Sequence, residues 1–155
     1  MDGKQAAKAP QEEAGVEGAD YVLEDQIGHV LRRAHQRASA IFMARFAELQ
    51  LTPTQYAALV KIRDQGEVSQ NLLGRLTAMD PATMKGVIDR LEKRGLIAFK
   101  ADPDDRRRTL WRLTGSGAAL IDAAVAAGVA TTAETLAPLT PKERKTLLAL
   151  LSRLT

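Results

Sequence analysis

The sequence of 155 residues contains no cysteine and few histidines or aromatic residues. The absence of cysteine excludes a disulfide framework, cysteine-ligated zinc, iron–sulfur clusters and thiol catalysis. His29 and His35 are six positions apart, which is not one turn of a helix, so we expect no paired-histidine metal site. Aromatic residues make up 4% of the chain, which argues against a protein that binds single-stranded nucleic acid on stacking platforms.

Long apolar segments are also absent. No apolar stretch follows Lys4, as a signal peptide would require. The sequence has no run of about 18 apolar residues, and its most apolar stretch, 118–130, contains Asp122 and Gly128. We therefore expect a cytoplasmic protein with no membrane segment. Residues 1–19 are polar, aperiodic and rich in glycine and alanine, which predicts a disordered N-terminal tail.

The net charge of +3 is unevenly distributed along the chain. Residues 1–31 contain two basic and seven acidic side chains, a net charge of −5. The other 20 basic and 12 acidic side chains give residues 32–155 a net charge of +8. Such a basic body favours a polyanionic partner.

Local start and stop signals divide the chain into helices. Pairs of a capping residue and proline at Thr52-Pro53, Asp80-Pro81 and Thr140-Pro141 mark helix starts. Gly66 and Gly95 mark helix ends. Apolar residues at spacings of three and four support each helix. The predicted helices cover residues 20–50, 52–65, 69–78, 80–94, 114–137 and 140–155.

The short helices over 69–78 and 80–94 are joined by a turn of about three residues, which is a helix-turn-helix. Residues 96–100 and 109–113 are short apolar, β-branched runs around a charged turn, which predicts a β-hairpin. The expected fold class is mainly α with a small β-hairpin wing. Residues 51–113 form the winged helix-turn-helix, and the outer segments 20–50 and 114–155 form a helical layer.

The helix over 80–94 has the character of a DNA-recognition helix. Its apolar stripe must face the core, which leaves small residues and basic residues on the opposite face. Small residues let a helix enter a major groove deeply, where Thr83 and Lys85 reach base edges. Taken alone, the pattern fits an ordinary charged surface helix equally well.

The predicted wing strengthens the interpretation as a DNA-binding protein. Three consecutive arginines, Arg106, Arg107 and Arg108, at a hairpin tip suit a narrow, negatively charged minor groove. Asp105 is expected to orient Arg107 by a paired hydrogen bond. The alternative is a solvated charged turn.

Residues 51–117 resemble the MarR family of bacterial winged-helix regulators. The matching segments are LTPTQYAAL at 51–59, LGRLTAMDPATMKGVIDRLEKRGLI at 73–97 and DPDDRRRTLWRLTGSG at 102–117. The helix plan resembles the family over residues 21–155. The resemblance implies an obligate homodimer in which the outer helices form the dimer layer and each winged helix reads one half-site of a palindromic operator.

The resemblance also implies a set of DNA contacts. It places five residues on the recognition helix and two at the wing, with Asp105 as the structural aspartate of the wing. The basic surface adds Arg90 and Arg108. Pro81 departs from the family pattern, in which many members have serine, so Thr83 and Lys85 would carry more of the readout. The predicted DNA-binding residues are Pro81, Ala82, Thr83, Lys85, Gly86, Arg90, Arg106, Arg107 and Arg108.

Dimerisation has independent support, because three helices outside the winged helix have wide apolar sides and no partner domain. In a monomer they would expose a large apolar patch, which a two-fold dimer covers. The alternative is a compact monomer in which these helices fold onto the winged helix.

The resemblance suggests an effector, namely a small aromatic or phenolic acid or its coenzyme A thioester. Residues 21–42 look most like the branch of the family that regulates aromatic-acid degradation. Gln26, His29, Arg33 and Gln36 share one side of the first helix, where Arg33 could pair with a carboxylate; a solvated face is the alternative. Arg45 lies on the apolar side, where it snorkels, meets an acidic partner or lines a pocket.

We expect no enzyme, no cofactor and no metal. Gly115-Ser116-Gly117 starts like a dinucleotide fingerprint, but Leu120 replaces the third glycine. The aspartates of the predicted wing lack the ligand spacing of a calcium loop. The sequence therefore predicts a homodimeric transcriptional repressor released from its operator by a small molecule. The alternative is a DNA-binding regulator or architectural module without a ligand.

Overall fold

The computed structural model describes residues 21–102 and 109–155. The predicted N-terminal tail and the wing residues Asp105, Arg106, Arg107 and Arg108 lie outside the described residues. The elements, in chain order, are η1 (Leu23–Asp25), α1 (Ile27–Arg45), α2 (Pro53–Gln65), β1 (Val68–Ser69), α3 (Gln70–Thr77), α4 (Pro81–Lys93), β2 (Ile97–Ala101), β3 (Thr109–Leu113), α5 (Gly115–Thr135) and α6 (Pro141–Leu151).

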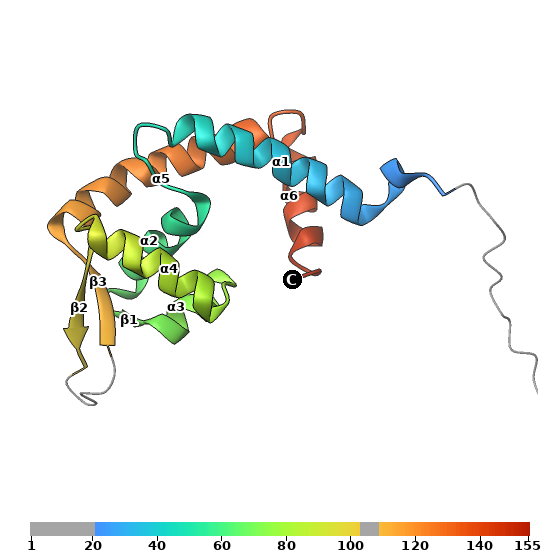
Figure 1. Ribbon diagram of the computed structural model, residues 1–155. Helices are drawn as coiled ribbons and strands as arrows, with labels where there is room; N and C mark the ends of the chain where they lie inside the picture. Colours follow the sequence, from blue (N-terminus) through green and yellow to red (C-terminus); the bar gives the residue numbers. More distant parts are fainter. Residues whose placement is uncertain (1–20, 103–108) are drawn as a thin grey trace, which may run out of the picture.

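Figure 1 shows two parts of the molecule. One is a lobe in which α2, α3 and α4 pack beside a small antiparallel sheet with strand order β1-β3-β2. The other is a pair of long helices, α1 and α5, which run side by side across the top of the lobe. The N-terminal part of α1 projects beyond the lobe, and α6 lies apart from the lobe. This arrangement confirms the predicted mainly α fold with a winged helix.

The predicted helix starts are confirmed because they depend on local hydrogen bonds. Thr52 and Gln55 form a reciprocal capping box at α2, and Thr140 and Glu143 form another at α6. The Asp80 side chain caps α4. Gly66 and Gly95 end their helices with φ values of 73° and 67°, a backbone conformation that glycine adopts without strain.

The first helix is shorter than predicted. It covers Ile27–Arg45 and not 20–50, because Gln26 is extended (ψ 126°) and separates it from the short 3-10 turn η1. After Arg45 the chain turns through residues 46–50, and Gln50 has a φ of 51°. The turn buries Phe46, which stacks on Phe42 with ring centroids 3.8 Å apart. Phe46 is therefore buried at the point where the helix ends.

The hairpin also differs from the prediction. β2 begins and ends one residue later than expected, and β3 gains a second partner, β1. Val68 and Ser69 of β1 pair with Trp111 and Leu110. Two residues are too few for a recognisable alternation of polar and apolar side chains, so the sequence does not reveal this strand.

The core of the lobe fixes the orientation of α4. The predicted apolar stripe of this helix, Met84, Val87, Ile88 and Leu91, is buried with at most 1% of each residue exposed. These side chains pack in one cluster with Leu59, Ile62, Leu73 and Ile97. Consequently the opposite face of α4 is turned to solvent.

Gly117 explains why the wing returns so closely to the core. A Cβ at this position would lie 2.9 Å from the carbonyl carbon of Leu96, so no larger residue fits without displacing backbone. The Thr114 amide donates to the Leu96 oxygen at 3.1 Å, and the Thr114 hydroxyl donates to the Gly95 oxygen at 2.6 Å. The start of α5 is thereby fixed against the end of α4.

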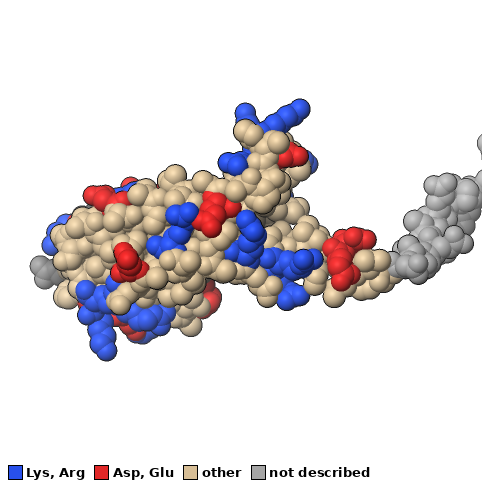
Figure 2. Space-filling view, turned by 90° about the horizontal axis from the view of Figure 1, so that it is seen from above, with Lys and Arg blue, Asp and Glu red and all other residues tan. Residues whose placement is uncertain are grey.

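Much apolar surface outside the lobe is exposed. No residue of α6 is buried, and Leu148 and Leu150 of this helix are each 51% exposed. Ile27 and Val30, in the projecting part of α1, are 63% and 47% exposed. Figure 2, which looks onto the α1 and α5 side, shows a largely uncharged surface with Lys and Arg gathered where α1 leaves the lobe.

Candidate nucleic-acid interface

The exposed face of α4 carries the residues expected to contact DNA. Pro81, Ala82, Thr83 and Lys85 are exposed, and Gly86 is half-buried. The first turn is therefore narrow and lacks long side chains, whereas Arg90, Lys93 and Arg94 provide positive charge in the last turn. A helix of this shape can enter a major groove by its N-terminal end.

Asp80 organises the first turn of α4. Its Oδ1 accepts a hydrogen bond from the Thr83 amide at 2.9 Å, and its Oδ2 accepts one from the Thr83 hydroxyl at 2.6 Å. These bonds, first the one from the hydroxyl and then the one from the amide, lower the pKa of Asp80 below its ordinary value. The carboxylate therefore stays ionised at neutral pH and accepts hydrogen bonds only.

The middle of α4 keeps its basic side chains close to the helix. Lys85 Nζ lies 2.6 Å from Asp89 Oδ2 in an exposed i, i+4 ion pair. The guanidinium of Arg90 lies over Gly86, at whose position a Cβ would be 3.4 Å from Arg90 Nη1. Exposed pairs of this kind contribute only about 0.3–0.5 kcal/mol, so Lys85 can exchange Asp89 for a phosphate at little cost.

Arg94 has a role that the sequence does not reveal. Its guanidinium donates to the main-chain oxygens of Gln50 at 2.6 Å and Leu49 at 3.2 Å, in the turn between α1 and α2. The C-terminal end of α4 is thereby attached to the connection between the long helices and the lobe. The sequence does not predict this contact, because a basic residue at a helix end is common and the acceptor lies 44 residues away.

The described part of the wing extends the basic surface. Lys100 of β2 pairs with Glu67 at 2.7 Å, and Arg112 of β3 is exposed. The three arginines of the tip and Asp105 lie outside the described residues, so their contacts with DNA stay a prediction.

A cavity of about 330 Å³ lies between α1, α5 and α6. Its walls are largely apolar, and its polar groups come from one histidine, one serine and three threonines. His35 Nε2 lies 3.4 Å from Ser39 Oγ. The lining residues are His35, Ala38, Ser39, Phe42, Pro53, Thr131, Thr132, Thr135, Leu136 and Leu148.

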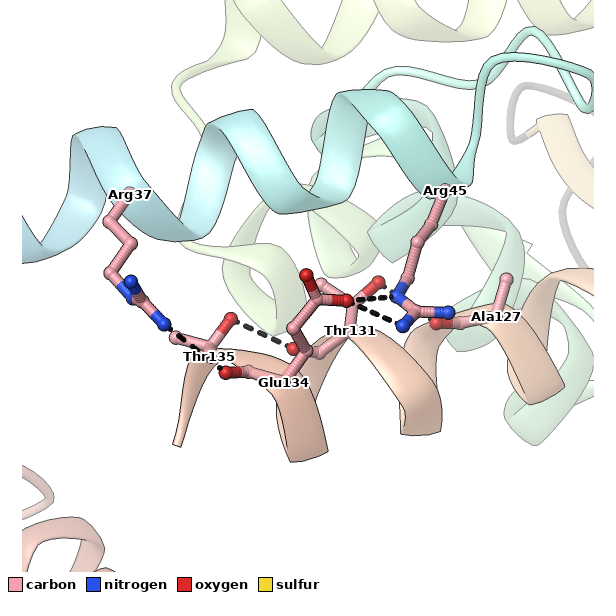
Figure 3. A network of polar contacts seen from close by, with 6 residues as sticks. All are labelled: Arg37, Arg45, Ala127, Thr131, Glu134 and Thr135. Atoms are coloured by element: carbon pink, nitrogen blue, oxygen red, sulfur yellow. Dashed lines mark hydrogen bonds and ion pairs between the residues drawn. The ribbon is translucent and has the colours of Figure 1, made fainter. Parts of the chain in front are cut away.

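Two of the threonine hydroxyls already use their protons. Thr131 donates to the Ala127 oxygen and Thr135 to the Thr131 oxygen, each at 2.8 Å (Figure 3). Each hydroxyl keeps lone pairs with which to accept a hydrogen bond. A ligand in the cavity would therefore find acceptors on α5 and the imidazole of His35 on α1.

None of the four residues predicted to bind the effector lines this cavity. Gln26 donates its side-chain amide to the Val22 oxygen at 3.0 Å, and His29 Nδ1 lies 3.2 Å from Arg32 Nη2. Arg33 and Gln36 are exposed. The residues of α1 that line it, His35, Ala38, Ser39 and Phe42, follow an i, i+3, i+4, i+7 spacing. This helical periodicity is the sequence signal that places them on one face.

Arg45 has an acidic partner, which decides among the three alternatives given for it. Its Nε donates to Glu134 Oε2 at 2.7 Å, and Arg37 reaches the main-chain oxygen of Glu134 at 3.5 Å (Figure 3). Both arginines belong to α1 and both contact the C-terminal part of α5. Glu134 therefore links the two long helices beside the cavity.

A second cleft of about 560 Å³ lies between α2, α5 and α6. Tyr56 of α2 reaches Gly128 of α5 in this cleft, and a Cβ at Gly128 would lie 2.8 Å from Tyr56 Cζ. Burial raises the pKa of the Tyr56 hydroxyl. Gly128 thus provides the space that brings the lobe against α5.

The comparisons with known proteins agree with this architecture. Residues 51–109 match the model of the MarR family. The chain is 37% identical to the HTH-type transcriptional repressor NicR of Pseudomonas putida over 95% of its own length and 93% of the relative. The chain belongs to the MarR family. This membership makes it a transcriptional regulator and not an enzyme.

Solved structures of MarR-family type share the fold. A probable transcriptional regulator from Pseudomonas aeruginosa is 51% identical, with a TM-score of 0.82 over 86% of this chain and 100% of that one. BpsR of Bordetella bronchiseptica, whose DNA binding is regulated by 6-hydroxynicotinic acid, is 40% identical, with a TM-score of 0.84 over 88% and 97%.

A MarR-family structure with DNA is also similar to this chain. A mutant of Escherichia coli MarR in complex with operator DNA is 25% identical, with a TM-score of 0.77 over 82% of this chain and 91% of that one. The chain thus has the winged-helix fold of a MarR-family transcriptional regulator.

Helix α5 resembles a membrane span in length and composition, and membership of the family excludes that role. With 21 residues and a mean hydropathy of 1.4, α5 has the length and composition of a membrane span, although its sequence gives no expectation of one. In this structure it packs against α1, α2 and β3. In a MarR-family regulator this single apolar helix is not a membrane span.

Proposed function

We propose that this protein is a homodimeric transcriptional repressor that binds a palindromic operator and is released by a small aromatic acid. The observation that carries the proposal is the burial of the apolar stripe of α4. It leaves a narrow N-terminal turn, with Thr83 and Lys85, facing outward beside the wing. The homology to NicR, a repressor, supports the direction of regulation.

The exposed apolar helices support the dimer. Leu154 is 69% exposed and Val129 is 67% exposed. Other apolar residues of α6 and of the projecting segment of α1 are exposed as well. A two-fold partner would cover these faces and give the dimer two copies of α4. To enter successive major grooves, the two helices must lie about 34 Å apart.

The cavity between α1, α5 and α6 supports a single-ring effector. Its volume of about 330 Å³ and its apolar walls suit one aromatic ring, whereas a coenzyme A moiety would have to lie outside. The His35 imidazole can donate to a carboxylate, and the threonines can accept from a ring hydroxyl. Because 6-hydroxynicotinic acid regulates BpsR, we propose a hydroxylated aromatic or pyridine carboxylic acid.

Release from DNA would follow from a shift between two dimer geometries. The cavity is bounded by helices of the proposed dimer layer, while Pro53 connects it to the lobe. An acid that binds more tightly to a dimer whose lobes are not spaced for the operator favours that spacing and so weakens operator binding. We place this activity in the cytoplasm, on the nucleoid.

The test is DNA binding with and without candidate acids. Genomic fragments bound by the protein are selected, and the affinity for the recovered site is measured by fluorescence anisotropy. We expect a palindromic site and a weaker affinity in the presence of 6-hydroxynicotinic acid or a related hydroxybenzoic acid. If no acid of the panel changes either the affinity or the melting temperature, the protein is a regulator or architectural module without a ligand.

A further inference from the structure

We infer that Asp80 restricts the Thr83 hydroxyl to the role of hydrogen-bond acceptor toward DNA. The hydroxyl accepts hydrogen bonds from bases and does not donate to them. Thr83 would then select adenine or cytosine at the base it contacts. The inference rests on the proposed function, because it assumes that α4 enters the major groove.

The hydrogen-bond geometry carries the first step. A threonine hydroxyl has one proton and two lone pairs. In this structure the proton points at Asp80 Oδ2, with the two oxygens 2.6 Å apart, and the carboxylate is held in place by a second bond from the Thr83 amide at 2.9 Å. Bonds to a carboxylate are roughly twice as strong as neutral ones. The Thr83 proton therefore stays hydrogen-bonded to Asp80, and only the lone pairs of the Thr83 oxygen are available to a base.

The chemistry of the base edges carries the second step. In the major groove, adenine N6 and cytosine N4 are donors, whereas adenine N7, guanine O6 and N7 and thymine O4 are acceptors, so only guanine and thymine offer acceptors alone. A free hydroxyl satisfies either kind, so threonine by itself is a weak discriminator. A hydroxyl whose proton is already bonded to Asp80 can bind only donor groups of the bases. A base that offers only acceptors at this position is left without a hydrogen-bond partner.

Capping alone does not require the carboxylate. Asparagine caps helices about as well as aspartate, and it would avoid placing a negative charge at the end of α4 that faces phosphates. Asp80 is fully exposed, so burial gives no reason for a carboxylate either. The carboxylate offers two acceptor oxygens, one for the Thr83 amide and one for its hydroxyl, whereas an asparagine side chain offers one.

The decisive variant is Asp80→Asn. Its Oδ1 retains the bond from the Thr83 amide, while Nδ2 replaces Oδ2 and donates to the Thr83 hydroxyl. The hydroxyl proton is released toward the DNA. We expect the preference for adenine or cytosine over guanine or thymine at one position of each half-site to weaken by about three- to tenfold, the value of one hydrogen bond.

The experiment measures the affinity for operators carrying each of the four bases at every half-site position. The full-length wild type, D80N, T83V and D80N/T83V are compared, and circular dichroism verifies that each is folded. Removal of a negative charge will strengthen binding to all DNA. In the T83V background, which has no hydroxyl, D80N should therefore change the affinity for all four bases by the same factor.

If the wild type prefers its operator over random DNA, two results would overturn the inference. One is a D80N effect that is the same for every base in the wild-type background. The other is a base-dependent D80N effect that persists in T83V. Failure of the proposed function is distinguishable, because the wild type would then show no preference for any operator over random DNA, which refutes both.

Discussion

Arg94 donates to the main-chain oxygen of Gln50 at 2.6 Å and so attaches the end of α4 to the turn between α1 and α2. Gln50 itself has a positive φ of 51°, an uncommon conformation for a residue other than glycine. The position of the recognition helix is thus linked to the segment through which the long helices enter the lobe.

Replacing Arg94 with alanine should lower the free energy of unfolding by about 1 kcal/mol, because two carbonyl oxygens lose a charged donor. Urea denaturation at a fixed protein concentration measures this. Arg90→Ala, on the same exposed face, is the matched control and should stay within about 0.5 kcal/mol of the wild type. Equal effects of the two substitutions would show that the Arg94 bonds contribute nothing to stability.

Gly128→Ala should destabilise the protein by about 1–3 kcal/mol, a range typical of an overpacked contact. A Cβ at this position meets the ring of Tyr56, so either the ring or α5 must move. Gly115→Ala is the control, because a Cβ there has no neighbour within 4 Å. If the two alanine variants unfold at the same urea concentration, Tyr56 yields without cost and the close approach is not a constraint.

The stability contributed by Glu143 should depend on pH. Hydrogen bonds from the Thr140 amide and then from its hydroxyl lower the pKa of Glu143 in the folded protein. A lowered pKa contributes stability above the unfolded pKa, and this is lost as the pH falls through the folded pKa. The difference in melting temperature between wild type and Glu143→Gln should therefore shrink from pH 7 to pH 3.

Glu92→Gln on α4 is the control for that titration, since Glu92 lies on an exposed turn. The melting temperature of Glu92→Gln should differ from that of the wild type by the same amount at both pH values. A Glu143→Gln difference that is constant from pH 7 to pH 3 would contradict the role of the ionised carboxylate in the cap.

His35→Ala should abolish the thermal stabilisation by an acid effector while leaving operator affinity within about twofold, because His35 lines the cavity and is remote from α4 in the sequence. The matched control is His29→Ala, since His29 lies outside the cavity and is one of the four residues that the sequence predicts to bind the effector. Should His29→Ala remove the effect and His35→Ala preserve it, the effector binds on the exposed side of α1, as the sequence predicts.

Arg107→Ala should weaken binding to operator and random DNA alike and reduce the salt dependence of binding by about one unit of slope. The reason is the loss of one phosphate or minor-groove contact at the predicted wing tip. A salt titration by anisotropy measures the slope, with Lys142→Ala on α6 as the control. An unchanged slope for Arg107→Ala would remove this arginine from the interface.

Much of the fold could be predicted because its signals are local. The capping boxes at Thr52 and Thr140, the cap at Asp80 and the buried stripe of α4 all follow from residues within one or two helical turns. Such interactions appear in the sequence as fixed spacings. For the same reason the sequence alone identifies the exposed face of α4, and with it Thr83 and Lys85.

The tertiary structure alone decided the contacts between distant segments. Arg45 and Glu134 are 89 residues apart, and Arg94 and Gln50 are 44 apart, so no spacing in the sequence joins them. The cavity likewise needs α1, α5 and α6 together, which is why the sequence points to His29 and not to His35. Local hydrogen bonds and periodicity determine which helices form and which face of each is apolar; only packing decides which of those faces meet.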